Sequence, residues 1–296
     1  MGKASRRRKG ADHASTTTRV DPAPFVRRPF EGLPGETEWV AMREILPAAT
    51  AVVSFAAGQA PEGAKDEATV ATVLPLAWPG LHRADGTVFF GTQSGSVSGD
   101  ASRDLAISLL AAASAELGTP VASTPPATAE SPRLQDLLDL SSPLDVTIHD
   151  GFDFWVGDNE LDEEGQASLE RANESVVPTA KMAAAPSAYW CRIGERTHIR
   201  LVLPDEEDLA TDALARLHAA GDSGLGEDTR LLGAFRACGL LVPVWDLDPE
   251  QAAADYEEPL AAFMRRYAEA LDTQDALTAQ ERRARSGLLS RQVTLR

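Results

Sequence analysis

The chain has 296 residues, of which 43% are hydrophobic and 25% are charged, a composition typical of a globular protein with a buried core. Its length suits one large domain or two small ones, and its composition excludes a fully disordered chain. No run of about 18 uncharged apolar residues is present, so the sequence predicts no membrane association. Two cysteines, Cys191 and Cys238, are too few for a disulfide framework, and we expect a cytoplasmic protein with reduced thiols.

The net charge of −17 is unevenly distributed along the chain. Residues 1–30 carry eight Lys or Arg against two Asp, residues 281–296 carry five Arg against one Glu, and residues 31–280 carry 15 basic against 42 acidic residues. An acidic body repels nucleic acid, so a nucleic-acid contact is expected only through the N-terminal end. Residues 1–28 are predicted to form a disordered basic tail. Its cationic residues are Lys3, Arg6, Arg7, Arg8 and Lys9.

The first half, residues 29–178, contains both helical and strand patterns. The β-branched run 68–75 predicts a strand, and Asp100 and Gly118 are the expected start and stop of a helix. Asp-Gly pairs at 85–86 and 150–151 predict hairpin turns. The predicted helices are 36–46, 101–117, 134–140 and 166–173, and the predicted strands are 51–57, 68–75, 87–92, 145–149 and 152–156.

The second half, residues 179–296, is predicted to contain two hairpins and three helices. Four acidic residues at 205–208 occupy the first turn of one of these helices, where carboxylates interact favourably with the helix dipole. The predicted hairpins pair 189–193 with 198–203 and 231–237 with 240–245. The predicted helices are 205–220, 259–271 and 278–289.

The two halves follow a similar order of hairpins and helices. Strand 68–75 and the following helix match 197–204 and its helix, and hairpin 145–156 matches hairpin 231–245. We therefore predict an α+β fold in which antiparallel hairpins pack against helices, as two pseudo-repeated halves that share a core. A chance similarity between two ordinary α+β segments is the alternative.

One candidate ligand site is the glycine-rich segment 91–103, which leads into a helix. Backbone amides at a helix N-terminus favour an anion, and Ser98, Asp100 and Arg103 are the candidate residues. The glycine spacing fits neither nucleotide-binding fingerprint, and the Asp100 carboxylate would itself compete for those amides.

A second candidate lies at the predicted hairpin tip 149–153. His149, Asp150 and Asp153 could relay a proton, although a polar turn explains them equally well. No histidine lies in a metal-binding pattern, and the sequence predicts neither a metal nor a cofactor.

Six strings resemble an actinobacterial family known as domain of unknown function 5926. They are PFEGLPG (29–35), VLPLAWP (73–79), SGDASRDL (98–105), HDGFD (149–153), YWCRIG (189–194) and LSRQVTLR (289–296). The resemblance extends from about residue 25 to the end and implies no activity. Some members carry an N-terminal cysteine-rich motif similar to the zinc-binding tail of a preprotein translocase ATPase, but residues 1–30 here contain no cysteine, so no zinc is implied.

These observations favour a non-catalytic interaction or regulatory protein with an unknown protein partner. A small-molecule-binding protein or enzyme that uses segments 91–103 and 149–153 is the first alternative. Ribosome or RNA association through the basic tail is the second. If the two segments lie more than about 15 Å apart, they cannot form a single site.

Overall fold

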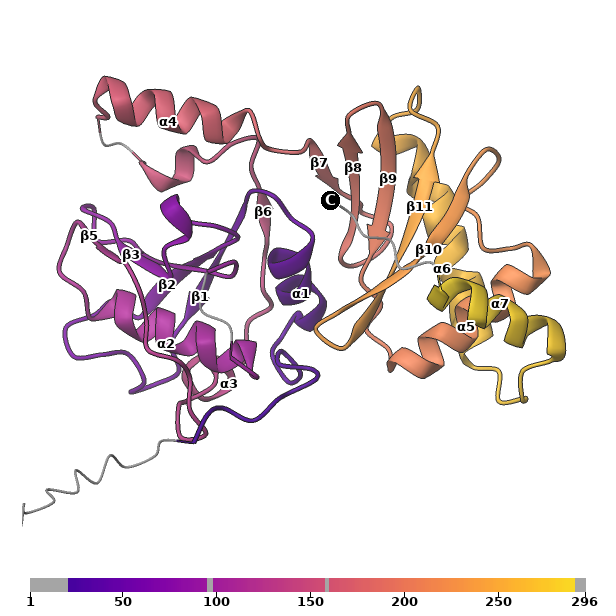
Figure 1. Ribbon diagram of the computed structural model, residues 1–296, viewed down its shortest axis with the longest axis horizontal. Helices are drawn as coiled ribbons and strands as arrows, with labels where there is room; N and C mark the ends of the chain where they lie inside the picture. Colours follow the sequence, from indigo (N-terminus) through magenta and orange to yellow (C-terminus); the bar gives the residue numbers. More distant parts are fainter. Residues whose placement is uncertain (1–20, 95–97, 158–159, 291–296) are drawn as a thin grey trace, which may run out of the picture.

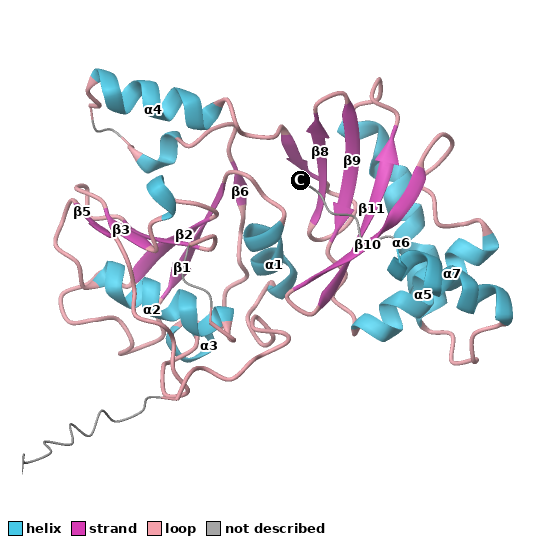
Figure 2. Cartoon of the chain, viewed as in Figure 1, coloured by secondary structure: helices cyan, strands magenta, loops and turns pink. Residues whose placement is uncertain are grey.

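The computed structural model describes residues 21–94, 98–157 and 160–290. Within these ranges the chain forms two β-sheets, each packed against helices (Figures 1 and 2). The predicted α+β fold is confirmed. The cationic residues of the predicted tail, at positions 3–9, lie outside the described residues.

The first half is built on a six-stranded sheet with the order β5-β3-β4-β2-β1-β6. Its strands are β1 (Ala49–Ser54), β2 (Glu67–Ala71), β3 (Gly80–His82), β4 (Val88–Gly91), β5 (Thr119–Val121) and β6 (Thr147–Ile148). Strands β2 and β4 run parallel, whereas the other neighbours are antiparallel. Its helices are α1 (Glu36–Glu44), α2 (Ala101–Ala113), α3 (Leu134–Leu137) and α4 (Glu163–Asn173).

The two faces of this sheet are covered differently. Helix α2 packs on one face, so closely that a Cβ built on Gly80 would lie 2.7 Å from the Cβ of Ala112. Because side chains alternate along a strand, the next residue, Leu81, points to the opposite face. That face carries the short 3-10 helices η1 (Pro75–Ala77) and η2 (Asp153–Trp155) and, above them, α4 (Figure 1).

The second half is an antiparallel sheet with the order β10-β11-β9-β8-β7. Its strands are β7 (Thr179–Lys181), β8 (Ala188–Ile193), β9 (Arg196–Leu201), β10 (Arg230–Ala237) and β11 (Leu240–Leu247). Its helices are α5 (Glu207–Ala220), α6 (Glu257–Leu271) and α7 (Ala279–Ser290), with the 3-10 helix η3 (Ala253–Tyr256) before α6. Both predicted hairpins are confirmed, and β11 places Trp245 edge-on against Phe263 of α6, with ring centroids 4.9 Å apart.

The halves meet where α1 lies against the second sheet. Buried apolar residues of the second half, including Tyr189, Val202 and Val242, belong to the core of the first half. At the same junction the buried Glu38 of α1 accepts a hydrogen bond from the Tyr189 hydroxyl and pairs with Lys181 at 3.0 Å. The second half also has a separate core under α5 and α6, so the predicted shared core covers only the α1 side of the molecule.

A lead-in without helix or strand, residues 21–35, runs along both halves before α1 begins, and its second part consists of bends and turns. The Val26 amide donates to the Gly99 carbonyl (2.8 Å), and the Ala23 amide donates to the Ala127 carbonyl (3.1 Å). Ala23 and Val26, which belong to the predicted tail 1–28, are therefore hydrogen-bonded to the first half.

The predicted hairpin 145–156 is wrong. Residues 147–148 form the short strand β6, which pairs with β1, and Asp153–Trp155 form η2 instead of a strand. The rings of Phe152 and Trp155 stack with centroids 4.4 Å apart, so they pack on each other and do not alternate between two faces of a sheet. The predicted match between this segment and the hairpin β10–β11 fails for the same reason.

Candidate functional site

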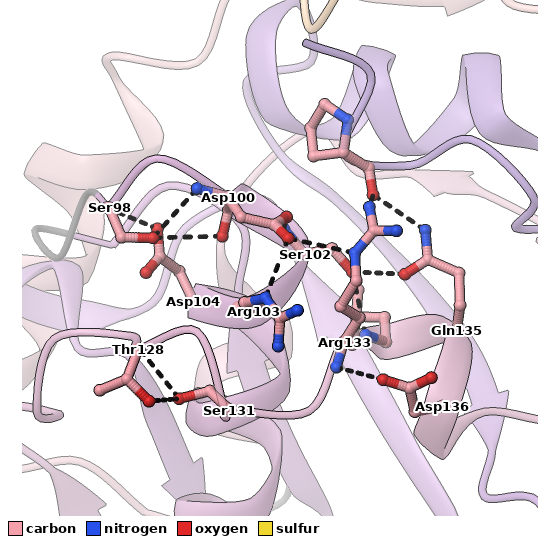
Figure 3. A network of polar contacts seen from close by, with 12 residues as sticks. Ser98, Asp100, Ser102, Arg103, Asp104, Thr128, Ser131, Arg133, Gln135 and Asp136 are labelled. Atoms are coloured by element: carbon pink, nitrogen blue, oxygen red, sulfur yellow. Dashed lines mark hydrogen bonds and ion pairs between the residues drawn. The ribbon is translucent and has the colours of Figure 1, made fainter. Parts of the chain in front are cut away.

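The three residues predicted in segment 91–103 lie together at the N-terminus of α2 (Figure 3). Asp100 is completely buried and caps the helix, because its Oδ1 accepts a hydrogen bond from the Ser102 amide (3.0 Å). Its Oδ2 lies 3.3 Å from Nε of Arg103 and 3.1 Å from Nε of Arg133. The anion at this helix N-terminus is thus supplied by the protein itself.

The surrounding contacts connect this helix start to α3 and to the lead-in. Ser102 donates to Gln135 (2.6 Å), and the Gln135 amide donates to the Pro29 and Glu31 carbonyls (both 2.9 Å). The Ser98 amide donates to Asp104 (2.8 Å). Asp100 therefore connects α2 to the segment before α3 through Arg133, whereas Arg103 pairs with Asp100 at the start of the same helix. Ser98 also borders the pocket described below.

The residues predicted at 149–153 do not converge on a common point. Nε2 of His149 lies 2.8 Å from the Thr50 hydroxyl, and the Asp153 carboxylate accepts from the Asn173 side chain (3.3 Å). Burial lowers the pKa of His149, and the nearby Asp150 carboxylate opposes this only in part. Among the described residues, no group of three His, Cys, Asp or Glu side chains is placed to hold a metal ion.

The two predicted segments also lie apart from each other. His149 follows β6, whereas residue 91 ends β4, and the sheet order places β1 and β2 between these strands. Three spacings of about 4.8 Å separate β6 from β4, or roughly 14 Å, which is below the limit of about 15 Å, so this distance alone does not exclude a single site. Residues 98, 99 and 101 line a pocket that is described below, and its lining contains no residue of segment 149–153.

A pocket of about 300 Å³ lies where the lead-in passes between the two halves. We call it the arginine pocket. Its walls come from the lead-in, α1, the start of α2, the first turn of α5 and the β10–β11 turn. Its polar residues are Arg27, Arg43, Ser98, Glu207, Arg236 and Cys238.

Two of these arginines are held by one buried carboxylate. Glu207, in the first turn of α5, has a side chain only 7% exposed, and its two oxygens accept from Arg27 and Arg236 separately. Both arginine side chains remain about half exposed. The third, Arg43, donates Nη1 to the Thr92 carbonyl (2.8 Å) and lies beside Glu44, at 3.3 Å. The pocket therefore presents three fixed guanidinium groups against a single lining carboxylate.

The ionisable groups of the pocket are poorly suited to acid–base or nucleophilic chemistry. Burial would raise the pKa of Glu207, but hydrogen bonds from Arg236 and Arg27 outweigh burial and hold it below its usual value. Burial, followed by the Glu44 carboxylate, raises the pKa of the Cys238 thiol to about 12. At neutral pH the carboxylate is already ionised and paired, and the thiol stays protonated, so neither is poised as a base or a nucleophile. The arrangement is suited instead to holding an anion.

Sequence reasoning found only one polar residue of this pocket, Ser98. Arg27, Arg43 and Arg236 are spread over more than two hundred positions, and no motif connects them. The only local signals were the predicted start of α5, which contains Glu207, and the turn predicted at Cys238.

A second group of ionisable residues lies on the second sheet. Cys191, His198 and Asp246 are directly opposite one another on β8, β9 and β11, and Nδ1 of His198 lies 3.7 Å from Asp246. Burial lowers the pKa of His198, and Asp246 and the Trp245 backbone oppose it only partly. Burial also raises the pKa of the Cys191 thiol, which therefore stays protonated at neutral pH.

The buried His198 is expected to make the fold sensitive to acid. Its pKa in the folded state is below the usual 6.5, so the unfolded state binds more protons as the pH falls through and below that value. Stability is therefore lost on acidification, and His198→Gln should reduce this loss. Urea midpoints of both proteins at about pH 7.5 and pH 5.5 test this. If the midpoint falls between these pH values by as much in the variant as in the wild-type protein, the prediction is wrong.

Taken together, the fold and pocket define a two-sheet α+β protein with an arginine-lined pocket between its halves. Residues 29–296 match the model of the family of unknown function DUF5926, and the chain belongs to that family. Neither the curated proteins nor the solved structures contained a match. No helix in the described residues is both long and apolar enough to cross a membrane.

Proposed function

We propose that this protein is a non-catalytic regulatory protein that binds a small anionic molecule, bearing a phosphate or carboxylate group, in the arginine pocket. One observation carries the proposal: Arg27, Arg43 and Arg236 line a 300 Å³ pocket between the two halves. Ligand sites occur preferentially at such interfaces.

The geometry favours an anion because the guanidinium groups are positioned in advance. Glu207 accepts hydrogen bonds from Nη2 of Arg27 and from Nε of Arg236. Each guanidinium has further N–H groups that can donate to a ligand. Arginine forms paired hydrogen bonds with phosphate and carboxylate groups, and a side chain that is already fixed loses less entropy on binding. The excess of acidic residues elsewhere, 42 against 15 in residues 31–280, repels anions from the rest of the surface.

A regulatory role is supported by the fact that the pocket walls come from three different parts of the chain. Arg43 belongs to the first half, Arg236 to the second and Arg27 to the lead-in, so a bound anion contacts all three. Such a ligand stabilises the arrangement that it bridges, which gives a protein partner a state to recognise. We place this protein in the cytoplasm, where the free cysteines Cys191 and Cys238 would stay reduced.

Titration calorimetry with inorganic phosphate, and separately with succinate, tests the proposal at constant ionic strength. We expect saturable binding of at least one of them, weakened about tenfold by Arg236→Gln, because one guanidinium contact is lost. Arg230→Gln is the matched control, since Arg230 lies at the other end of β10 and its side chain is 72% exposed. Circular dichroism checks that both variants fold.

The comparison between the variants decides the outcome. Equal weakening by the two substitutions would show that only general charge is sensed, and the absence of saturable binding of either anion to the wild-type protein would refute the proposal.

A further inference from the structure

A second hollow lies between α4 and the outer face of the first sheet, away from the arginine pocket. It has a volume of about 370 Å³, within the range of small-molecule sites. We call it the α4 groove. Its apolar walls include Trp78, Leu81, Trp155, Val156, Leu161 and Leu169.

Helix α4 covers this groove without filling it. None of the residues of α4, all of which the structure describes, is buried. Asp162 caps the start of the helix, and its other end is attached to the η2 segment because Asn173 accepts from the Phe152 amide (2.7 Å). Between these ends, the small residues Gly165 and Ser168 line the groove. Protein interiors are normally packed to crystal-like density. The layer between α4 and the sheet therefore lacks the apolar atoms that would complete its packing.

The charged and polar groups at the α4 groove already have partners within the protein. The guanidinium of Arg83 is paired with Asp85 (2.6 Å) and donates to the Phe154 carbonyl (2.6 Å). The indole N–H of Trp155 donates to the Val73 carbonyl (2.9 Å). Because these polar groups are already satisfied, an ionised ligand would lose hydration without gaining a partner.

The rim of the groove carries strained backbone and exposed apolar surface. Leu76 and Ala77 both have positive φ values, 53° and 54°, which non-glycine residues rarely adopt. This conformation holds the Leu76 side chain 87% exposed, next to the groove residue Pro75. Strain of this kind persists where surrounding structure enforces it, and it clusters at ligand sites.

We propose that the α4 groove binds a compact, uncharged, apolar molecule that packs between the tryptophan-lined sheet face and α4. The unfilled layer indicates where the ligand lies. Because Arg83 is already paired, the ligand carries no charge, and the aromatic walls favour an apolar ligand. This site is independent of the proposed anion binding, since no described residue lines both pockets.

The neutral fluorescent probe N-phenyl-1-naphthylamine tests the proposal, because its emission rises in an apolar site. We expect saturable binding to the full chain, weakened at least about tenfold by Ser168→Phe, whose ring fills the groove. Gln166→Phe is the control: it adds the same ring to the same helix, two residues away and thus on a different face, outside the groove lining. Leu169→Gln, which replaces an apolar wall, should also weaken binding.

Three results would overturn the proposal. The probe could bind Ser168→Phe and Gln166→Phe with equal affinity, which would show that it binds outside the α4 groove. Its sulfonated relative, 8-anilinonaphthalene-1-sulfonate, could bind more tightly to the groove, which contradicts an uncharged ligand. Sedimentation velocity could show a wild-type dimer that Ser168→Phe dissociates, which makes the groove a contact between copies of the chain. Thermal unfolding of each variant confirms that loss of binding is not loss of fold.

Discussion

Replacing Asp100 by alanine should lower the free energy of unfolding by about 3–5 kcal/mol, the range expected when one partner of a buried charge cluster is removed. The substitution leaves the largely buried Arg103 and Arg133 without their common carboxylate. It also removes the N-cap of α2, which by itself contributes about 1 kcal/mol. The network in Figure 3 connects α2, α3 and the lead-in, so the effect should extend beyond the helix.

Two further substitutions separate the charge from the cap. Asp100→Asn keeps an oxygen for the Ser102 amide but removes the negative charge, and it should retain part of the stability. Asp162→Ala removes an N-cap on the surface, at α4, and should cost only about 1 kcal/mol. Urea unfolding of all three variants provides the comparison. Equal costs for Asp100→Ala and Asp162→Ala would show that the buried arginine pairs contribute nothing.

Much of the fold could be predicted from local signals. Helix α2 begins after its predicted cap Asp100, and both hairpins of the second sheet turn between the predicted strands, at Gly194 and Gly239. Apolar periodicity, caps and turns are properties of neighbouring residues, so one sequence displays them directly. The parallel pairing of β2 with β4 gives no such signal, because it depends on contacts distant in sequence.

The wrong hairpin at 145–156 shows where local signals mislead. Asp150-Gly151 is typical of a hairpin turn, and Phe152, Phe154 and Trp155 are frequent in strands. In the folded protein Phe154 and Trp155 pack against the apolar cluster on the outer face of the first sheet, which contains Leu81 and Phe89, and Phe152 stacks on Trp155. Packing against a neighbouring sheet overrides the local preference, and a single sequence does not reveal that neighbour.

The candidate sites were predictable only in part. Segment 149–153 is followed directly by Trp155 and Val156, which line the α4 groove, and segment 91–103 contributes Ser98 to the arginine pocket. The two segments thus lie near two different pockets. The arginines were missed because they converge from separate elements, and their charge is unremarkable until the fold brings them together.

The β10–β11 turn contacts the lead-in, so adding a single methyl group there by Gly239→Ala should strongly reduce the stability of the protein. Gly239 has a φ of +81°, and a Cβ there would lie 2.6 Å from the Arg27 carbonyl oxygen. We expect a loss of about 2–4 kcal/mol, the sum of an unfavourable backbone conformation and overpacking against the main chain.

The matched control is Gly194→Ala in the β8–β9 turn. Gly194 also has a positive φ, +61°, but its Cβ would meet no atom within 4 Å, so only the conformational cost of about 1 kcal/mol should remain. If the two variants lose equal stability, the lead-in does not press on the β10–β11 turn. Limited proteolysis with trypsin adds a local measurement, because displacement of the lead-in should expose the bond after Arg27 in Gly239→Ala but not in Gly194→Ala. Since Arg27 and Gly239 both line the arginine pocket, the same displacement should abolish phosphate or succinate binding while Gly194→Ala preserves it.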